Sequence, residues 1–437
     1  MSTPSSSLLQ GAAINLAGKI VLVVAGLLIT FIVARLGPQV QGAFSLFAAC
    51  EAVMLALFSG LGLALAREVS HHGNDPAEAL SAMLVACLAL GAVAAVAALA
   101  VAAVSTQEPY RHLWLLAAGA PFLLFLPTAS SLWMGQGRML PLNVAQGAAP
   151  VTVLSLLVAG SVLRPHLSPL ASVALVTCVL WAWVLGKSLV GVATAWFAFH
   201  DAGRAPPHWY VLRRELRFVG VIGLTNVISL LNYRASLFII GHFCGLAKAG
   251  VYSVAVQVGE LLWLLSSAVT VSAYHRIGAP DTAQAAAMTV RAVRINIVAT
   301  VLAAPVLLSL AWWALPTILG PVYAQARQPL AYLLPGIASY AAASSLSAFY
   351  TNHLGRPHLS ATVAGLSLAL NVGGSWWAVP RYGVSAAAVS TSVAYVLAIV
   401  LATALFLRHA GLGWSAWWRV SWRDNTAQAA GSGRPAG

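Results

Sequence analysis

The sequence carries little charge for its length. Of its 437 residues, only 8% are Asp, Glu, Lys or Arg, whereas about a quarter of the residues in soluble domains are charged. A folded chain of this size could not cover a water-facing surface with so few charges. The composition therefore argues against a soluble enzyme, a nucleic-acid-binding domain and a disordered chain.

Acidic residues and paired cysteines are especially scarce. The chain has 10 Asp and Glu residues and four cysteines, and no two of these cysteines form a CxxC pair. Isolated cysteines in apolar surroundings are usually small packing residues. Neither a disulfide framework nor a metal site is expected, and no cofactor is expected either. The cysteines are Cys50, Cys87, Cys178 and Cys244.

What the sequence has instead is long apolar runs. The mean hydropathy is +0.85, and runs of about 20 apolar residues, the length that crosses a bilayer as a helix, recur from end to end. We predict an all-α, polytopic membrane protein with about 12 transmembrane helices. The predicted spans cover residues 12–34, 43–66, 80–104, 112–134, 142–163, 170–199, 218–241, 250–272, 295–315, 330–351, 358–379 and 384–407.

One polar insert divides these spans six and six. It contains a Pro pair and four arginines, and we interpret it as a cytoplasmic linker between two halves. The predicted division is an N-terminal six-helix half over 1–199, the linker over 200–217, a C-terminal six-helix half over 218–410 and a cytoplasmic tail over 411–437.

Short segments recur at similar displacements in the two halves. The segment Gly42–Leu46 (GAFSL) matches Gly250–Val254 (GVYSV) 208 positions later, and Asn15 matches Asn226 at a displacement of 211. Because six is even, two such halves would share one orientation, and parallel repeats of this kind place the substrate at their interface. The sequence therefore predicts two parallel six-helix repeats around a central cavity. Chance matching in a low-complexity apolar chain is the alternative.

Basic residues concentrate on one side of the predicted membrane. The 23 Lys and Arg residues give a net charge of +13, and most lie in short loops between apolar runs. If the N-terminus is cytoplasmic, fourteen of them lie inside and six outside. The positive-inside rule then predicts that both termini are cytoplasmic. The basic loops are expected to meet anionic lipid, and no nucleic-acid partner is expected.

Several stretches carry a family resemblance. They are Ala34-Arg35-Leu36-Gly37-Pro38, Leu231-Asn232-Tyr233-Arg234, Gly250–Gln257, Glu260–Leu265 and Leu354-Gly355-Arg356-Pro357. They resemble the polysaccharide-transport (O-antigen) flippases of the multidrug/oligosaccharidyl-lipid/polysaccharide exporter superfamily. The resemblance extends over essentially all the predicted spans.

This resemblance implies a transporter of the bacterial inner (cytoplasmic) membrane. Such a protein would flip an undecaprenyl-diphosphate-linked oligosaccharide by alternating access and would not be an enzyme. Its expected partners are this substrate, membrane lipids and other polysaccharide-assembly proteins. Two other functions stay open: a drug–cation antiporter of the same superfamily, which would want an acidic pocket, and a membrane enzyme of polysaccharide assembly.

The candidate site residues follow from the chemistry of an anionic head group that crosses hydrocarbon. Charged residues within spans are costly and usually face a cavity or a partner, and guanidinium suits bidentate contact with phosphate. The predicted substrate-binding residues are Arg234, Lys19, Asn15, Asn226, Tyr233 and Arg35. The predicted coupling or ion-pair residues are Glu260, Glu51 and Lys187.

Each assignment has a structural alternative. Arg35 lies at a predicted helix end and could anchor to head groups, and the two lysines could extend their side chains to the membrane surface. Arg234 could form an interhelical ion pair with Glu260. Glu51 could form a buried interhelical hydrogen bond.

Overall fold

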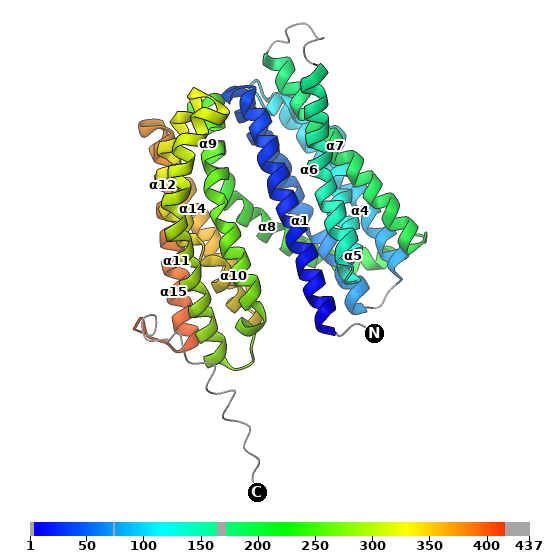
Figure 1. Cartoon of the computed structure of the whole chain (residues 1–437). Helices are drawn as coiled ribbons and strands as arrows, with labels where there is room; N and C mark the ends of the chain where they lie inside the picture. The colour runs from blue at the N-terminus through cyan, green and yellow to red at the C-terminus, as the bar shows by residue number, and fades with distance from the viewer. Residues whose placement is uncertain (1–3, 73–74, 164–171, 416–437) are drawn as a thin grey trace. The chain divides into compact units, whose positions relative to one another are not determined.

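The computed structural model describes residues 4–72, 75–163 and 172–415, and within these ranges it is helical with no strand (Figure 1). The all-α fold is therefore confirmed. The α-helices are α1 (Pro4–Arg35), α2 (Pro38–Phe58), α3 (Gly60–Arg67), α4 (Pro76–Val104), α5 (Leu113–Gly135), α6 (Met139–Leu163), α7 (Ser172–Ala202), α8 (Trp209–Cys244), α9 (Leu246–Glu260), α10 (Leu262–Ile277), α11 (Thr282–Ala314), α12 (Arg327–Tyr340), α13 (Ala343–Ala348), α14 (Pro357–Tyr382) and α15 (Val384–Ala410). Shorter helical turns are η1 (Glu68–His72), η2 (Tyr110–His112), η4 (Leu315–Leu319), η5 (Pro321–Ala326) and η6 (Phe349–His353).

Ten helical stretches of the described chain are long and apolar enough to cross a membrane. The two predicted spans outside this set are 330–351 and 358–379. The first is broken, because α12 is only 14 residues long and the short helix α13 follows it. The second is α14, which is 26 residues long and carries buried polar side chains, among them Ser367, Asn371 and Ser375.

Two predicted spans are interrupted where the sequence suggests continuous helices. The span at 43–66 comprises α2 and α3, which meet at Ser59, and the span at 250–272 comprises α9 and α10, which meet at Leu261. At both positions the backbone N–H donates three residues back, from Ser59 to Ala56 and from Leu261 to Val258, at 3.3 Å. This tighter bonding replaces the usual four-residue spacing and locally interrupts the α-helix.

The described residues fall into two compact units. The first unit comprises Met1–Val254 with Pro316–Tyr323, and the second comprises Ala255–Leu315 with Ala324–Gly437. Helix α8 and most of α9 therefore pack with the first unit, although the repeat assigns them to the second half. Compact units and repeat halves are different divisions, so the predicted halves stay a prediction. Of the predicted linker, residues 209–217 are the first part of α8.

The same order of helix packing occurs in both units. In the first unit α5 packs on α4 and α7, and α6 packs on α7. In the second unit α12 packs on α11 and α15, and α14 packs on α15. If the predicted spans are numbered from 1 to 12, the packed pairs in the first unit are spans 3 and 4, 4 and 6, and 5 and 6. The packed pairs in the second unit are spans 9 and 10, 10 and 12, and 11 and 12. This correspondence supports an internal repeat over the six-helix period.

Candidate transport site

Helix α8, the seventh predicted span, packs closely on α2 through glycines. A Cβ added at Gly223 would overlap the carbonyl oxygen of Leu57, and one at Gly241 would lie 2.8 Å from the Leu46 side chain. The two helices can therefore approach only because these positions lack a side chain, as is common between membrane helices.

The predicted polar stripe lies along this helix. Asn226 Nδ2 donates to Ser59 Oγ at 2.8 Å, so the amide binds the point where α2 ends and α3 begins. Arg234 follows Gly223 by eleven residues, which places it about 20° around the helix from that glycine. It therefore lies on the side of α8 that packs on α2. Arg234 and Tyr233 are both half-buried.

Glu51 lies on α2 in the segment that faces this part of α8, and its side chain is 1% exposed. Its carboxylate accepts from Lys187 Nζ at 2.5 Å and from Trp183 Nε1 at 2.5 Å, both on α7. Lys187 Nζ also lies 4.3 Å from the Trp183 ring centroid. The structure thus places Glu51 in a buried interhelical contact. The Lys187 ammonium is paired with this carboxylate.

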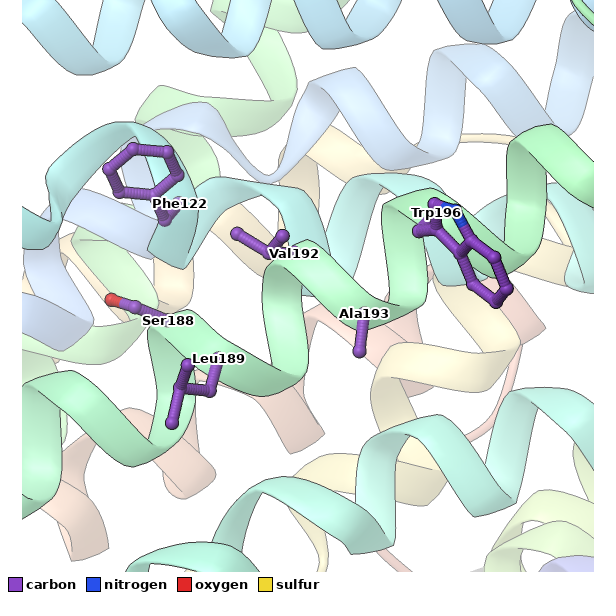
Figure 2. Close-up of a pocket in the computed structure, with 6 residues that line it drawn as sticks. All are labelled: Phe122, Ser188, Leu189, Val192, Ala193 and Trp196. Carbon is purple, nitrogen blue, oxygen red and sulfur yellow. The ribbon is translucent and has the colours of Figure 1, made fainter.

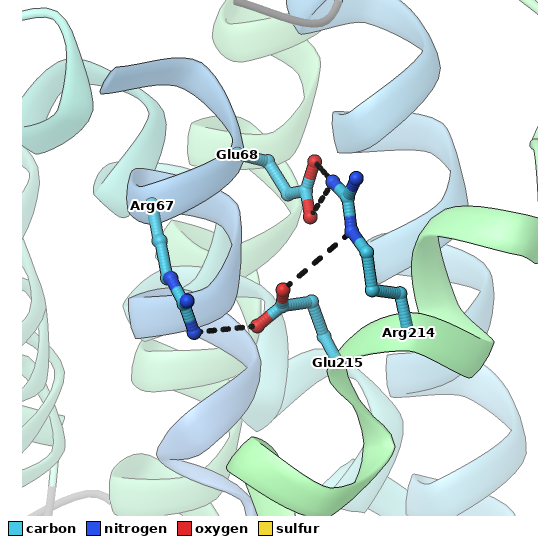
Figure 3. Close-up of polar contacts among 4 residues, drawn as sticks. All are labelled: Arg67, Glu68, Arg214 and Glu215. Carbon is cyan, nitrogen blue, oxygen red and sulfur yellow. Dashed lines mark hydrogen bonds and ion pairs between the residues drawn. The ribbon is translucent and has the colours of Figure 1, made fainter. Parts of the chain in front are cut away.

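A second group of charges joins the end of α3 to the start of α8 (Figure 3). Arg214 donates to both carboxylate oxygens of Glu68. The Glu215 carboxylate lies between two guanidiniums. Its Oε2 is 3.7 Å from Arg67 Nη1, and its Oε1 is 3.8 Å from Arg214 Nε. Glu68 and Glu215 are buried. These contacts tie the chain that enters α8 to the preceding helices.

Other predicted residues lie on α1 and α9. Lys19 and Arg35 of α1 are exposed, and the Arg35 guanidinium lies 5.5 Å from the Phe31 ring centroid. Glu260 is half-buried at the end of α9, in the second unit. The side chain of Asn15 lies outside the described residues. The structure therefore places Asn226, Tyr233 and Arg234 on α8, which packs on α2, and it pairs Glu51 of α2 with Lys187 of α7.

The repeated segments of the sequence meet each other in the first unit, where α2 crosses α9. A Cβ at Gly42 would overlap the carbonyl oxygen of Leu246, and a Cβ at Gly250 would overlap that of Pro38. Leu246 corresponds to Pro38 at the same displacement that relates Gly250 to Gly42. The two contacts are therefore equivalent under the repeat. The crossing of the two helices thus has a local two-fold symmetry.

Hydroxyl groups lie at the centre of this crossing. Ser45 Oγ and Ser253 Oγ, equivalent positions 208 residues apart, are joined by a 2.9 Å hydrogen bond. Gln41 Nε2 donates to both serines, at 3.1 and 3.2 Å. The displacement of 208 found in the sequence thus corresponds to a contact between the two copies.

Among the residues that the structure describes, the fully buried polar side chains of the second unit are uncharged. Asn296 Nδ2 donates to Ser345 Oγ at 3.0 Å and to Thr270 Oγ1 at 3.3 Å. Asn371 Oδ1 accepts from Ser375 and Thr391, both at 3.1 Å. These networks are built from neutral amides and hydroxyls.

Sequence reasoning missed two of these features. It did not pair Glu51 with Lys187, although Trp183 and Lys187 are four residues apart and so share a helix face. It also left Glu68, Arg214 and Glu215 in loops. The Leu-Arg-Arg-Glu-Leu sequence before Arg217 carries a helical signal that could have extended α8. Within the described ranges, no three His, Cys, Asp or Glu side chains lie close enough together to hold a metal ion.

Comparison with solved structures gives the fold. An inward-facing multidrug resistance MATE family transporter of the MOP superfamily superposes with a TM-score of 0.72 at 15% identity, over 91% of this chain and 95% of that one. An outward-facing structure of such a transporter gives 0.65 at 16% identity, over 96% and 98%. The chain has the fold of these transporters.

A further neighbour has a different pocket chemistry. A MOP superfamily transporter from Pyrococcus furiosus, described as having a binding pocket of reversed polarity that suggests a different function, gives a TM-score of 0.61 at 14% identity, over 94% of this chain and 96% of that one. The sequence matches no protein-family model and no curated protein. At these identities the likeness extends to the fold alone.

Proposed function

We propose that the protein is a transporter that moves an anionic, lipid-linked oligosaccharide across a bacterial inner membrane by alternating access, with both termini in the cytoplasm. The substrate class is an undecaprenyl-diphosphate-linked glycan, as the sequence resemblance implies. Support for transport comes from the fold, since neighbours with this fold are described in inward-facing and outward-facing conformations.

The charge balance along α2, α7 and α8 carries the choice of substrate. The buried Glu51 carboxylate is paired with Lys187 at 2.5 Å, and α8 carries Arg234 in a half-buried position. The buried carboxylate is thus balanced by a lysine, and the α8 residue is a guanidinium, which suits contact with phosphate. In a low-dielectric interior, basic side chains of this kind favour a diphosphate over a cation.

A drug–cation antiporter is the second candidate, because several neighbours of this fold are described as multidrug resistance transporters. Such a protein needs an acidic group free to meet a cation. In the first unit the buried carboxylates Glu51, Glu68 and Glu215 all lie beside lysine or arginine. This pairing favours the anionic substrate. A membrane enzyme has no comparable support.

A strain that lacks the gene separates these functions. If the protein is a flippase, lipid-linked glycan accumulates in the cytoplasmic leaflet while susceptibility to cationic drugs is unchanged. If cationic drugs become more toxic and the glycan is exported normally, the antiporter is correct. If synthesis of the lipid-linked glycan itself stops, the protein is an enzyme of assembly and transport is wrong.

Variants of Arg234 test the charge assignment in the same assay. Arg234→Lys is expected to keep partial export, because the charge stays while the bidentate fork is lost. Arg234→Gln is expected to lower export by roughly tenfold or more, which is about 1.4 kcal/mol of binding. If Glu260→Gln fully restores export to Arg234→Gln at matched protein levels, Arg234 is a structural partner and not a substrate ligand.

A further inference from the structure

Two adjoining hollows flank helix α7 on the outside of the first unit. The first has a volume of about 530 Å³ and lies between Phe122 of α5 and an apolar face of α7 that includes Leu189, Val192 and Trp196 (Figure 2). The second, of about 440 Å³, lies between α6 and α7. Its apolar walls include Val144 and Phe197, whose side chains are largely exposed. In the membrane such exposed apolar side chains would contact lipid.

The two hollows meet at Ala193, which lines both. Successive residues of a helix are rotated by about 100°, so the two sets of α7 residues lie on neighbouring faces that share Ala193. Along the axis, the stretch from Ser188 to Asp201 rises about 20 Å. That length exceeds half of the roughly 30 Å hydrocarbon core, so the surface extends from the bilayer interior to one membrane face.

The second hollow ends in a pair of opposite charges. Asp201 Oδ2 accepts from Trp133 Nε1 at 2.9 Å and from Arg138 Nη1. The side chains of Arg138 and Asp201 are 50% and 31% exposed. Both of these donors bond the Oδ2 atom, and the exposed parts of the two side chains leave room for a further contact. His200 lines the same end.

We propose that these hollows bind one zwitterionic phospholipid with a primary amine, of the phosphatidylethanolamine class. Its two acyl chains occupy the hollows on either side of Ala193. Its phosphate meets Arg138, and its ammonium donates to Asp201 Oδ1. With the predicted orientation, this lipid belongs to the cytoplasmic leaflet.

Head-group chemistry decides between the lipids that could enter. Phosphatidylglycerol brings only negative charge, which Asp201 repels, and it has no ammonium to offer to the Oδ1 atom. A choline ammonium carries no N–H, so it cannot donate a hydrogen bond to Asp201. A primary amine both neutralises the carboxylate and donates to it, and charge-assisted bonds of this kind are the stronger ones.

The test is native mass spectrometry of the purified full-length protein in equimolar phosphatidylethanolamine, phosphatidylglycerol and phosphatidylcholine. The wild type is expected to retain one phosphatidylethanolamine with about tenfold preference, the equivalent of one charge-assisted hydrogen bond. Asp201→Asn, which keeps the shape of the side chain, should reduce this preference to about twofold or less. Ala193→Trp fills the junction of the hollows and should abolish retention of all three lipids.

Glu78→Gln is the matched control. Glu78 is an acidic residue of similar exposure, 36%, that pairs with His208 outside the hollows, and its substitution should leave the preference unchanged. Equal retention of the three lipids by the wild type would overturn the proposal, as would a preference that survives Asp201→Asn. Glycan export is a separate readout, so failure here leaves the proposed transport function standing.

Discussion

The two compact units hold their buried polar groups in different ways. The first unit buries three carboxylates, Glu51, Glu68 and Glu215, and each lies beside a lysine or arginine. In the described part of the second unit, the fully buried polar side chains are hydroxyls and amides, as around Asn296 and Asn371.

This difference has a mechanical consequence. A buried ion pair fixes two helices in one register, because separation leaves an uncompensated charge in low dielectric. A hydroxyl both donates and accepts, so a hydroxyl–amide network can re-form after a small helix shift. We therefore expect the first unit to be rigid and the second to permit helix movement.

The largest expected effect comes from breaking an ion pair of the first unit. Lys187→Met leaves Glu51 buried and unpaired, and should lower the free energy of unfolding by about 3–5 kcal/mol. Thermal stability of the purified protein, followed by size-exclusion chromatography after heating, measures this loss. Adding Glu51→Gln should restore most of the stability, because the unpaired charge is removed and an amide can still bond Trp183.

The control for this experiment is Lys248→Met, since Lys248 is exposed on α9. It should change the stability by less than about 0.5 kcal/mol. If Lys187→Met were as mild as this control, the first unit would not depend on its ion pair and the contrast between the units would be wrong.

A smaller effect is expected at the place where the two copies of the repeat are alike. Gly42→Ala and Gly250→Ala each force a methyl group onto a backbone carbonyl of the other helix, and overpacking of this kind costs about 1–3 kcal/mol. Because the two sites are equivalent, the two losses should agree closely. Gly26→Ala, where a Cβ would meet nothing within 4 Å, is the control. Unequal losses of stability would mean that the two glycine contacts are not energetically equivalent, although they are equivalent under the repeat.

Much of the fold could be predicted from the sequence, because apolar run length alone identifies helices that cross a bilayer. The repeat was also visible, since Gly42 and Gly250 stand in matching short segments. The interruptions at Ser59 and Leu261 were not. A hydropathy average cannot detect a change from four-residue to three-residue hydrogen bonding within a uniformly apolar run.

The candidate site was less predictable. The residue types and the depth of Glu51 and Arg234 follow from the spans, but the partner of Glu51 is 136 positions away, and only tertiary packing brings Lys187 to it. The pairing of Glu68 with Arg214 was hidden for a second reason. A polar insert with two prolines suggests a linker, although its last residues continue into α8.

The smallest expected effect lies in the neutral network of the second unit. Thr391→Val removes one of the two hydroxyl donors to Asn371 Oδ1 and leaves the bond from Ser375. Because the amide oxygen keeps a partner, Thr391→Val should lower the free energy of unfolding by about 1 kcal/mol. This is the usual size for a hydrogen bond between membrane helices. Thr362→Val is the control, since its exposed hydroxyl bonds only its own helix at His358 and should matter less. Both are measured by the heating assay used for Lys187→Met. A loss at Thr391 as large as that at Lys187 would mean that the second unit is held as rigidly as the first, and the mechanical contrast between them would fail.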